Sequence, residues 1–117
     1  MSLPHRIAVI VPSTINASES APNETVAKWI KAAKVKFARL FGGFTAHNAV
    51  GGWVSQEHGL IEETVTVVAS FTDEDGLEYL ASVKEFAARM AEAMGQEVVS
   101  VEVDHQMEFV SPLAVAA

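Results

Sequence analysis

The amino-acid sequence predicts an α+β fold, a ferredoxin-like split βαββαβ sandwich in which two helices cover one face of an antiparallel sheet. Helical spacing of apolar residues occurs twice, and β-type runs precede, separate and follow these two segments. The chain has 117 residues, of which 50% are hydrophobic and 20% charged, as is typical of one globular domain. We expect a single domain over residues 1–117, with an ordered core at about 5–110 and a flexible tail at 111–117.

The first strand is predicted at Arg6–Pro12, a β-branched run that ends at a proline. The polar segment Ser13–Asn23 that follows is typical of a turn region leading into a helix. Ser20 or Asn23 is the expected N-cap of that helix, because both side chains can accept a hydrogen bond from a free backbone N–H.

The first helix is predicted at Glu24–Phe41, where apolar residues recur every three or four positions. It ends at Gly42, since glycine tolerates the left-handed conformation of a helix C-terminus. Its outer face is basic and carries Lys28, Lys31, Lys34, Lys36 and Arg39.

A central hairpin is predicted from Phe44–Val54 and Leu60–Phe71, with its turn at Gln56–Gly59. The first strand reads as an edge strand, and its Gly51-Gly52 pair indicates a bulge or a close backbone approach.

Alternation along Leu60–Phe71 separates two faces. We expect the odd-numbered residues to meet the helices. The opposite, open face of the sheet should then be half apolar and suit dimerisation or a ligand floor. Its expected members are Ala8, Ile10, Thr64, Thr66, Val68, Ser100 and Glu102.

The second helix is predicted to start at the acidic capping segment Thr72–Asp75 and to stop at Gly95. Beyond it, Glu97–Val103 and Met107–Val110 indicate two strands. They would form an additional terminal hairpin, although its turn at Asp104–Gln106 lacks the usual glycine.

A resemblance accompanies these patterns. The segments VPST, LFGGFTA, GGWVS, LIEETVTVV and GQEVVSVEV resemble those of a family of small uncharacterised prokaryotic proteins, often plasmid-encoded. Members have an Asn-Gly turn where this chain has Asp104-His105, so the resemblance implies a different terminal hairpin here. It spans most of the chain and implies the ferredoxin-like architecture, but it assigns no activity and no catalytic residue.

Charge is unevenly distributed in this chain of net charge −7: residues 1–41 carry +4 and residues 42–117 carry −11. The acidic total disfavours general nucleic-acid binding, which needs a positive surface. There are no cysteines, so a disulfide, a thiolate zinc site and a cysteine nucleophile are excluded. The N-terminal residues fit neither a secretory signal nor a membrane span, and we expect a cytoplasmic protein.

One set of residues could line a ligand pocket between the sheet and the first helix: Ser13, Thr14, Asn16 and Trp53, with His47 or Glu63 as a proton acceptor. Alternatively, the hydroxyls make turn hydrogen bonds, Trp53 belongs to the core and Glu63 pairs with a lysine. Glu63 stands out because alternation places its carboxylate on the apolar face, where an unpaired charge is costly; otherwise it is solvated at the strand end.

Two further sets of residues are candidate sites. Lys28, Lys31, Lys36 and Arg39 could dock an acidic partner or a phosphate backbone, or form an ordinary solvated face. The four histidines have no ligand spacing, and we expect no metal and no cofactor.

These patterns favour a non-catalytic role over an enzyme: a small cytoplasmic ligand-binding or protein-interaction module, homodimeric through its open sheet face or an edge strand. One alternative is a cofactor-free isomerase or monooxygenase of the dimeric α/β-barrel type that uses His47 or Glu63. Another is a nucleic-acid-associated regulator that uses the basic first helix. The sequence identifies neither the ligand, the partner nor the oligomer size.

Overall fold

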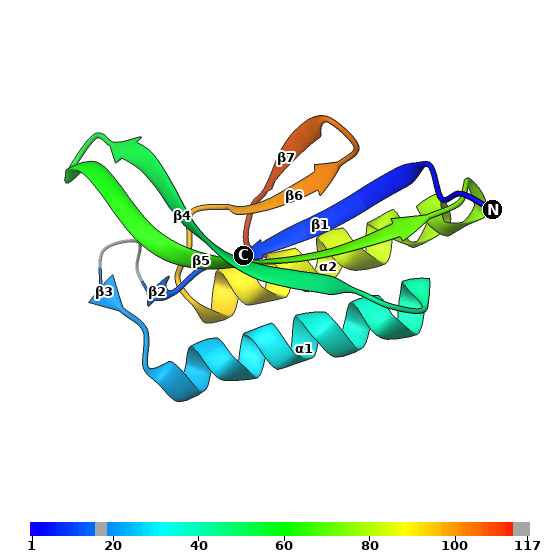
Figure 1. The fold of residues 1–117 in the computed structure, drawn as a ribbon. Helices are drawn as coiled ribbons and strands as arrows, with labels where there is room; N and C mark the ends of the chain where they lie inside the picture. Colours follow the sequence, from blue (N-terminus) through cyan, green and yellow to red (C-terminus); the bar gives the residue numbers. More distant parts are fainter. Residues whose placement is uncertain (16–18, 114–117) are drawn as a thin grey trace.

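A computed structural model describes residues 1–15 and 19–113, and it shows two helices packed on one face of an antiparallel sheet (Figure 1). The main sheet has five strands in the order β4-β5-β1-β6-β7. This arrangement confirms the predicted α+β fold, including the additional C-terminal strand. In chain order the elements are β1 (His5–Val11), β2 (Thr14–Ile15), β3 (Glu19–Ser20), α1 (Asn23–Phe41), β4 (Thr45–Ser55), β5 (Gly59–Thr72), the 3-10 helix η1 (Asp75–Tyr79), α2 (Leu80–Ala93), β6 (Val99–Val103) and β7 (Gln106–Val110).

Strand β1 is the centre of the sheet. It pairs with β5 along its whole length, from His5 opposite Thr72 to Val11 opposite Thr66, and with β6 on its other side. Its β-branched side chains Ile7 and Val9 are fully buried against the helices. Burial of each such side chain stabilises the fold by roughly 1.5–3 kcal/mol, so this strand anchors the core.

The expected orientation of β5 is wrong. Its even-numbered residues, among them Thr66 and Val68, face the helices, because they pair opposite the inward-facing Val11 and Val9 of β1. Two of the buried hydroxyls on that face have acceptors: Thr66 Oγ1 donates to Asn48 Oδ1, and Ser70 Oγ donates to the carbonyl of Gly43. The odd-numbered residues lie on the helix-free face.

The start of α1 also differs from expectation. Its N-cap is Pro22, and no side chain caps it, so neither Ser20 nor Asn23 has the expected role. The carbonyl of Pro22 instead accepts from the N–H groups of Thr25 and Val26. Within the expected turn region, Thr14–Ile15 and Glu19–Ser20 pair as a small separate sheet.

Strand β4 is the edge strand that the sequence predicted, but Gly51-Gly52 do not form a bulge. The two strands of the hairpin pair residue for residue, with Gly51 opposite Glu63 and Gly52 opposite Glu62. The close approach is real: a Cβ at Gly52 would lie 3.2 Å from the carbonyl oxygen of Ile61.

The β6–β7 hairpin forms although its turn lacks a glycine. Asp104 takes the left-handed conformation, with φ +56°, which aspartate tolerates better than most residues. Its backbone N–H donates to the carbonyl of Arg6 at 2.7 Å, and its Oδ1 accepts from the N–H of Arg6 at 2.9 Å. These bonds to β1 hold the turn in place.

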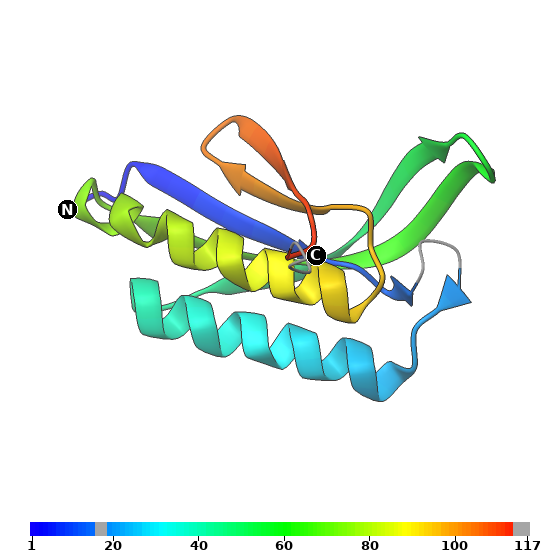
Figure 2. The ribbon, with the colours of Figure 1, turned by 180° about the vertical axis from the view of Figure 1, so that it is seen from behind.

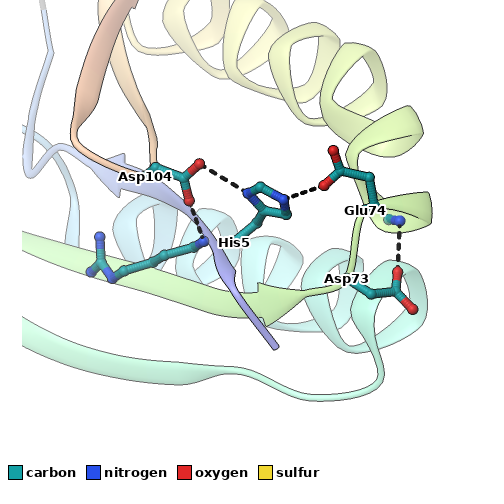
Figure 3. A network of polar contacts seen from close by, with 6 residues as sticks. His5, Asp73, Glu74 and Asp104 are labelled. Atoms are coloured by element: carbon teal, nitrogen blue, oxygen red, sulfur yellow. Dashed lines mark hydrogen bonds and ion pairs between the residues drawn. The ribbon is translucent and has the colours of Figure 1, made fainter. Parts of the chain in front are cut away.

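His5 joins this turn to the start of η1 (Figure 3). Its Nδ1 lies 3.0 Å from Asp104 Oδ2, and its Nε2 contacts the carboxylate of Glu74. Hydrogen bonds that His5 makes to the carboxylates of Asp104 and then Glu74 raise the pKa of His5, and the hydrogen bond with His5 lowers the pKa of Asp104. We call His5, Glu74 and Asp104 the histidine clasp.

The histidine clasp should make stability depend on pH. Because folding raises the pKa of His5, its stabilising contribution is complete below the ordinary histidine pKa of 6.5 and is lost as pH rises through the pKa of the folded state. The stabilising contribution of Asp104 is present above its ordinary pKa of 3.8 and is lost as pH falls through its lowered pKa in the folded state. We expect His5→Gln to lower the melting temperature more at about pH 5.5 than at about pH 8.5. The exposed His58→Gln is the control; an equal effect of His5→Gln at both pH values would contradict the clasp.

Candidate functional site

The helix-free face of the sheet is hollowed. The β4–β5 and β6–β7 hairpins both rise on this side, away from the helices (Figure 2). Between them lies a pocket with a cavity volume of about 500 Å³, and Ile10 of β1 lies on its floor. The pocket therefore spans the sheet from one edge hairpin to the other.

The walls of the pocket are mostly apolar. Trp53 of β4 comes from one hairpin, and Met107 and Phe109 of β7 come from the other. Phe109 has 67% of its surface exposed, which is unusual for a large aromatic side chain in a small domain. Gly51 leaves space between them because it has no side chain.

The charged groups of the pocket are all acidic. Glu63 and Glu97 line it, and no Lys, Arg or His is among the described residues that do so. Glu63 Oε2 accepts hydrogen bonds from the backbone N–H of Ser13 at 2.9 Å and from its hydroxyl at 3.3 Å. The carboxylate on the apolar face is thus satisfied by the loop after β1 and not by a lysine.

Gln96 closes the end of the pocket next to this loop. Its side chain is buried, and its Nε2 donates to the carbonyl oxygen of Thr14 at 2.7 Å and to its hydroxyl at 3.2 Å. The segment between α2 and β6 is therefore tied to β2. Together with the bond from Ser13 to Glu63, this contact fixes one rim of the pocket.

The structure brings together only part of the ligand set expected from sequence, and the pocket lies on the helix-free face of the sheet, not between the sheet and α1 as expected, because the odd-numbered residues of β5 face away from the helices. Trp53 and Glu63 line the pocket. Ser13 and Thr14 lie behind it and hold Glu63 and Gln96. Of the two expected proton acceptors, Glu63 lines the pocket, whereas His47 is exposed on β4 opposite Val67 and does not. Asn16 lies outside the described residues.

Sequence reasoning missed the residues that the β6–β7 hairpin and the α2–β6 segment contribute, Gln96 and Phe109 above all. Phe109 could have been found from the sequence, because alternation in Gln106–Val110 puts the apolar side chains of Met107 and Phe109 on one face of the strand. No pattern indicated Gln96, because its contact with Thr14 joins positions far apart in the chain.

The basic residues of α1 lie on another surface. Lys28, Lys31, Lys36 and Arg39 all line a shallow groove on the helix layer, together with Phe86 of α2. Residues 1–15 and 19–113 contain no cluster of three or more His, Asp or Glu side chains placed to hold a metal ion. No helix in the same residues is long and apolar enough to cross a membrane.

Comparisons with known proteins locate the fold. No family model matches the chain, and no curated protein matches it. Among solved structures, it is similar to a phage SAM lyase in complex with S-methyl-5'-thioadenosine, with TM-score 0.65, 17% identity and coverage of 92% of this chain and 88% of that one. The same enzyme in its apo state gives TM-score 0.60, 15% identity and coverage of 93% and 90%. Pyrococcus horikoshii CutA gives TM-score 0.50, 16% identity and coverage of 86% and 81%. At these identities the similarity establishes the fold.

The contact between Gln96 and Thr14 should contribute measurably to stability. We expect Gln96→Ala to lower the free energy of unfolding by about 1–3 kcal/mol, because it removes a buried donor from a backbone carbonyl. Urea denaturation measures this loss. Glu97→Ala, at the exposed neighbouring position, is the control and should change stability by less than about 0.5 kcal/mol. If both variants lost the same free energy of unfolding, the contact between Gln96 and Thr14 would not contribute specifically to stability.

Proposed function

We propose that the protein binds a small molecule in the pocket on the helix-free face, and that this molecule is neutral or cationic and has a flat, apolar body. This proposal rests on the residues that line the pocket, which combine apolar and aromatic walls with the carboxylates of Glu63 and Glu97. Ligand pockets commonly combine such walls with a few polar groups that orient the ligand.

The charge of the lining selects among ligands. A phosphate group would meet two carboxylates with no basic lining residue to neutralise it, so phosphorylated ligands should be rejected. Both hydrogen bonds to Glu63 use Oε2, so Oε1 can accept a bond from a donor on the ligand. A cationic group near this carboxylate would gain a charge-assisted interaction.

The fold comparison suggests the first compounds to test. S-methyl-5'-thioadenosine, bound by the similar phage enzyme, is neutral and has a flat purine. SAM has the same purine and adds a positively charged sulfonium. Both fit the chemistry of this lining, which is why we choose them as probes.

We further propose that the protein is a homodimer through the β4–β5 hairpin. Three apolar side chains on the face of this hairpin away from the pocket are exposed: Val50 at 72%, Val54 at 76% and Leu60 at 67%. β4 is also an edge strand, whose outer backbone groups can pair with another strand. An apolar patch beside a free edge is a common self-association surface.

The ligand proposal is tested by calorimetric titration with S-methyl-5'-thioadenosine, SAM and adenosine monophosphate. We expect the first two to bind and the monophosphate to bind at least about tenfold more weakly, since its phosphate would face the carboxylates. Glu63→Gln should weaken the binding of SAM by about three- to tenfold and that of S-methyl-5'-thioadenosine less, because only SAM has the positive charge.

A second variant tests the location. A Cβ at Gly51 fits at 3.4 Å from Val65 Cγ1, so Gly51→Val should fold while its added methyl groups fill the pocket and abolish binding. Thr64→Val, on the opposite face of β5, should leave binding unchanged. Binding that survives Gly51→Val, or equal affinity for the monophosphate, would contradict the proposal.

The dimer proposal is tested by sedimentation velocity of the full chain. We expect a dimer that the double variant Val54→Lys, Leu60→Lys converts to a monomer, because two buried positive charges would oppose association. Val35→Lys, an exposed apolar position on α1, is the control. A monomeric wild-type protein would contradict the proposal, as would a dimer that the hairpin variant does not disturb.

A further inference from the structure

The outer side of the helix layer carries a second surface, which the proposed ligand pocket does not use. A groove with a volume of about 710 Å³ runs along α1 where Phe86 of α2 lies beside it. Its cations are Lys28, Lys31, Lys36 and Arg39, and its apolar centre includes Val35 and Phe86. We call this surface the α1 groove.

The cations of the α1 groove form no ion pair with a carboxylate of the described residues, although Lys28 Nζ lies 5.6 Å from the ring centroid of Trp29. Among the ion pairs formed within residues 1–15 and 19–113, none involves a lysine or arginine of α1. Glu85 of α2 lies near Lys36, but its carboxylate pairs with Arg89 at 2.8 Å. The chain has 15 acidic residues, so the missing pairs do not reflect a shortage of carboxylates.

The apolar centre distinguishes this groove from an ordinary solvated face. Val35 is 38% exposed in the middle of the cations, and Phe86 packs edge-on against Trp29, with ring centroids 5.7 Å apart. Burial of these apolar side chains against a partner would be favourable because it removes apolar surface from water. A partner with an apolar stripe would provide such a contact.

The length of the α1 groove indicates the length of the partner segment that it can bind. The groove follows α1 from Lys28 to Arg39, which spans roughly 17 Å at 1.5 Å per residue. That length matches about three turns of a second helix. We propose that the α1 groove docks an acidic amphipathic helix of a partner protein, with its apolar stripe on Val35 and Phe86 and its carboxylates beside the lysines.

Two other anionic partners fit the groove less well. A nucleic acid would use the cations but would leave the apolar centre without a contact, and the net charge of −7 opposes it. An anionic membrane would require larger apolar side chains that can insert among lipids, whereas the exposed apolar residue here is a valine.

The test uses the full chain and a synthetic helical peptide of about 18 residues, with leucines at positions i, i+4, i+7 and i+11 and glutamates on both sides. Fluorescence anisotropy measures its affinity. We expect binding that Lys31→Glu weakens at least about fivefold, because the substitution reverses a charge that faces the peptide. Val35→Asn should weaken it about tenfold through loss of apolar contact. A peptide of the same composition with scattered leucines should not bind.

The control variant is Lys34→Glu. It changes the net charge of the protein by the same amount on the same helix, but Lys34 does not line the groove; its ammonium lies 5.9 Å from the ring centroid of Phe44. It should alter the affinity by less than about twofold. Circular dichroism checks that all variants fold.

Four results would overturn the proposal. One is no binding of the striped peptide. Another is an equal effect of Lys31→Glu and Lys34→Glu. A third is preference for an oligothymidylate or for anionic vesicles, with Lys31→Glu reducing that binding. The fourth is self-association of the wild-type chain that Lys31→Glu abolishes, which would make a second copy the occupant.

Discussion

The architecture depends on one constraint, the position of β1 between β5 and β6 with its inward side chains sealed by the helices. Because both edges of β1 are hydrogen-bonded, the two hairpins have to grow outward from it on opposite sides. The β4–β5 hairpin extends beyond the helices, and both hairpins rise on the helix-free side (Figure 1). The pocket is the space that they leave above β1, so the stability of the core and the shape of the pocket come from the same strand.

Much of the fold could be predicted from sequence, but the faces of β5 could not. The periodicity of Glu24–Phe41 and the β-branched run around Val9 gave the helix and the central strand, because both patterns report burial directly. In β5 both faces are buried from Val65 to Ser70, so hydrophobicity does not separate them. The hydroxyls of Thr66 and Ser70 donate hydrogen bonds to Asn48 and Gly43, so these polar side chains can lie under the helices.

The candidate site was only partly predictable for a related reason. Trp53 and Glu63 were found because their residue types stand out within one hairpin. The other wall comes from β7, and the rim depends on Gln96 and Thr14, which meet only in the folded chain. The charged surfaces are separated in the same way: the acidic pocket and the basic α1 groove lie on opposite faces of the sheet-and-helix sandwich. The basic first part of the sequence thus supplies the cations of the α1 groove, and the acidic remainder supplies the two carboxylates of the pocket.

The absence of a side chain at Gly51 has an evolutionary consequence. This residue belongs to an edge strand, pairs with a neighbour on one side only and lies at the wall of the pocket, far from the sealed face of β1. Replacement by alanine, serine or valine would change the room available to a guest molecule without disturbing the interior. A single codon change at this position would therefore alter the shape of the pocket while leaving the side chains packed between β1 and the helices in place.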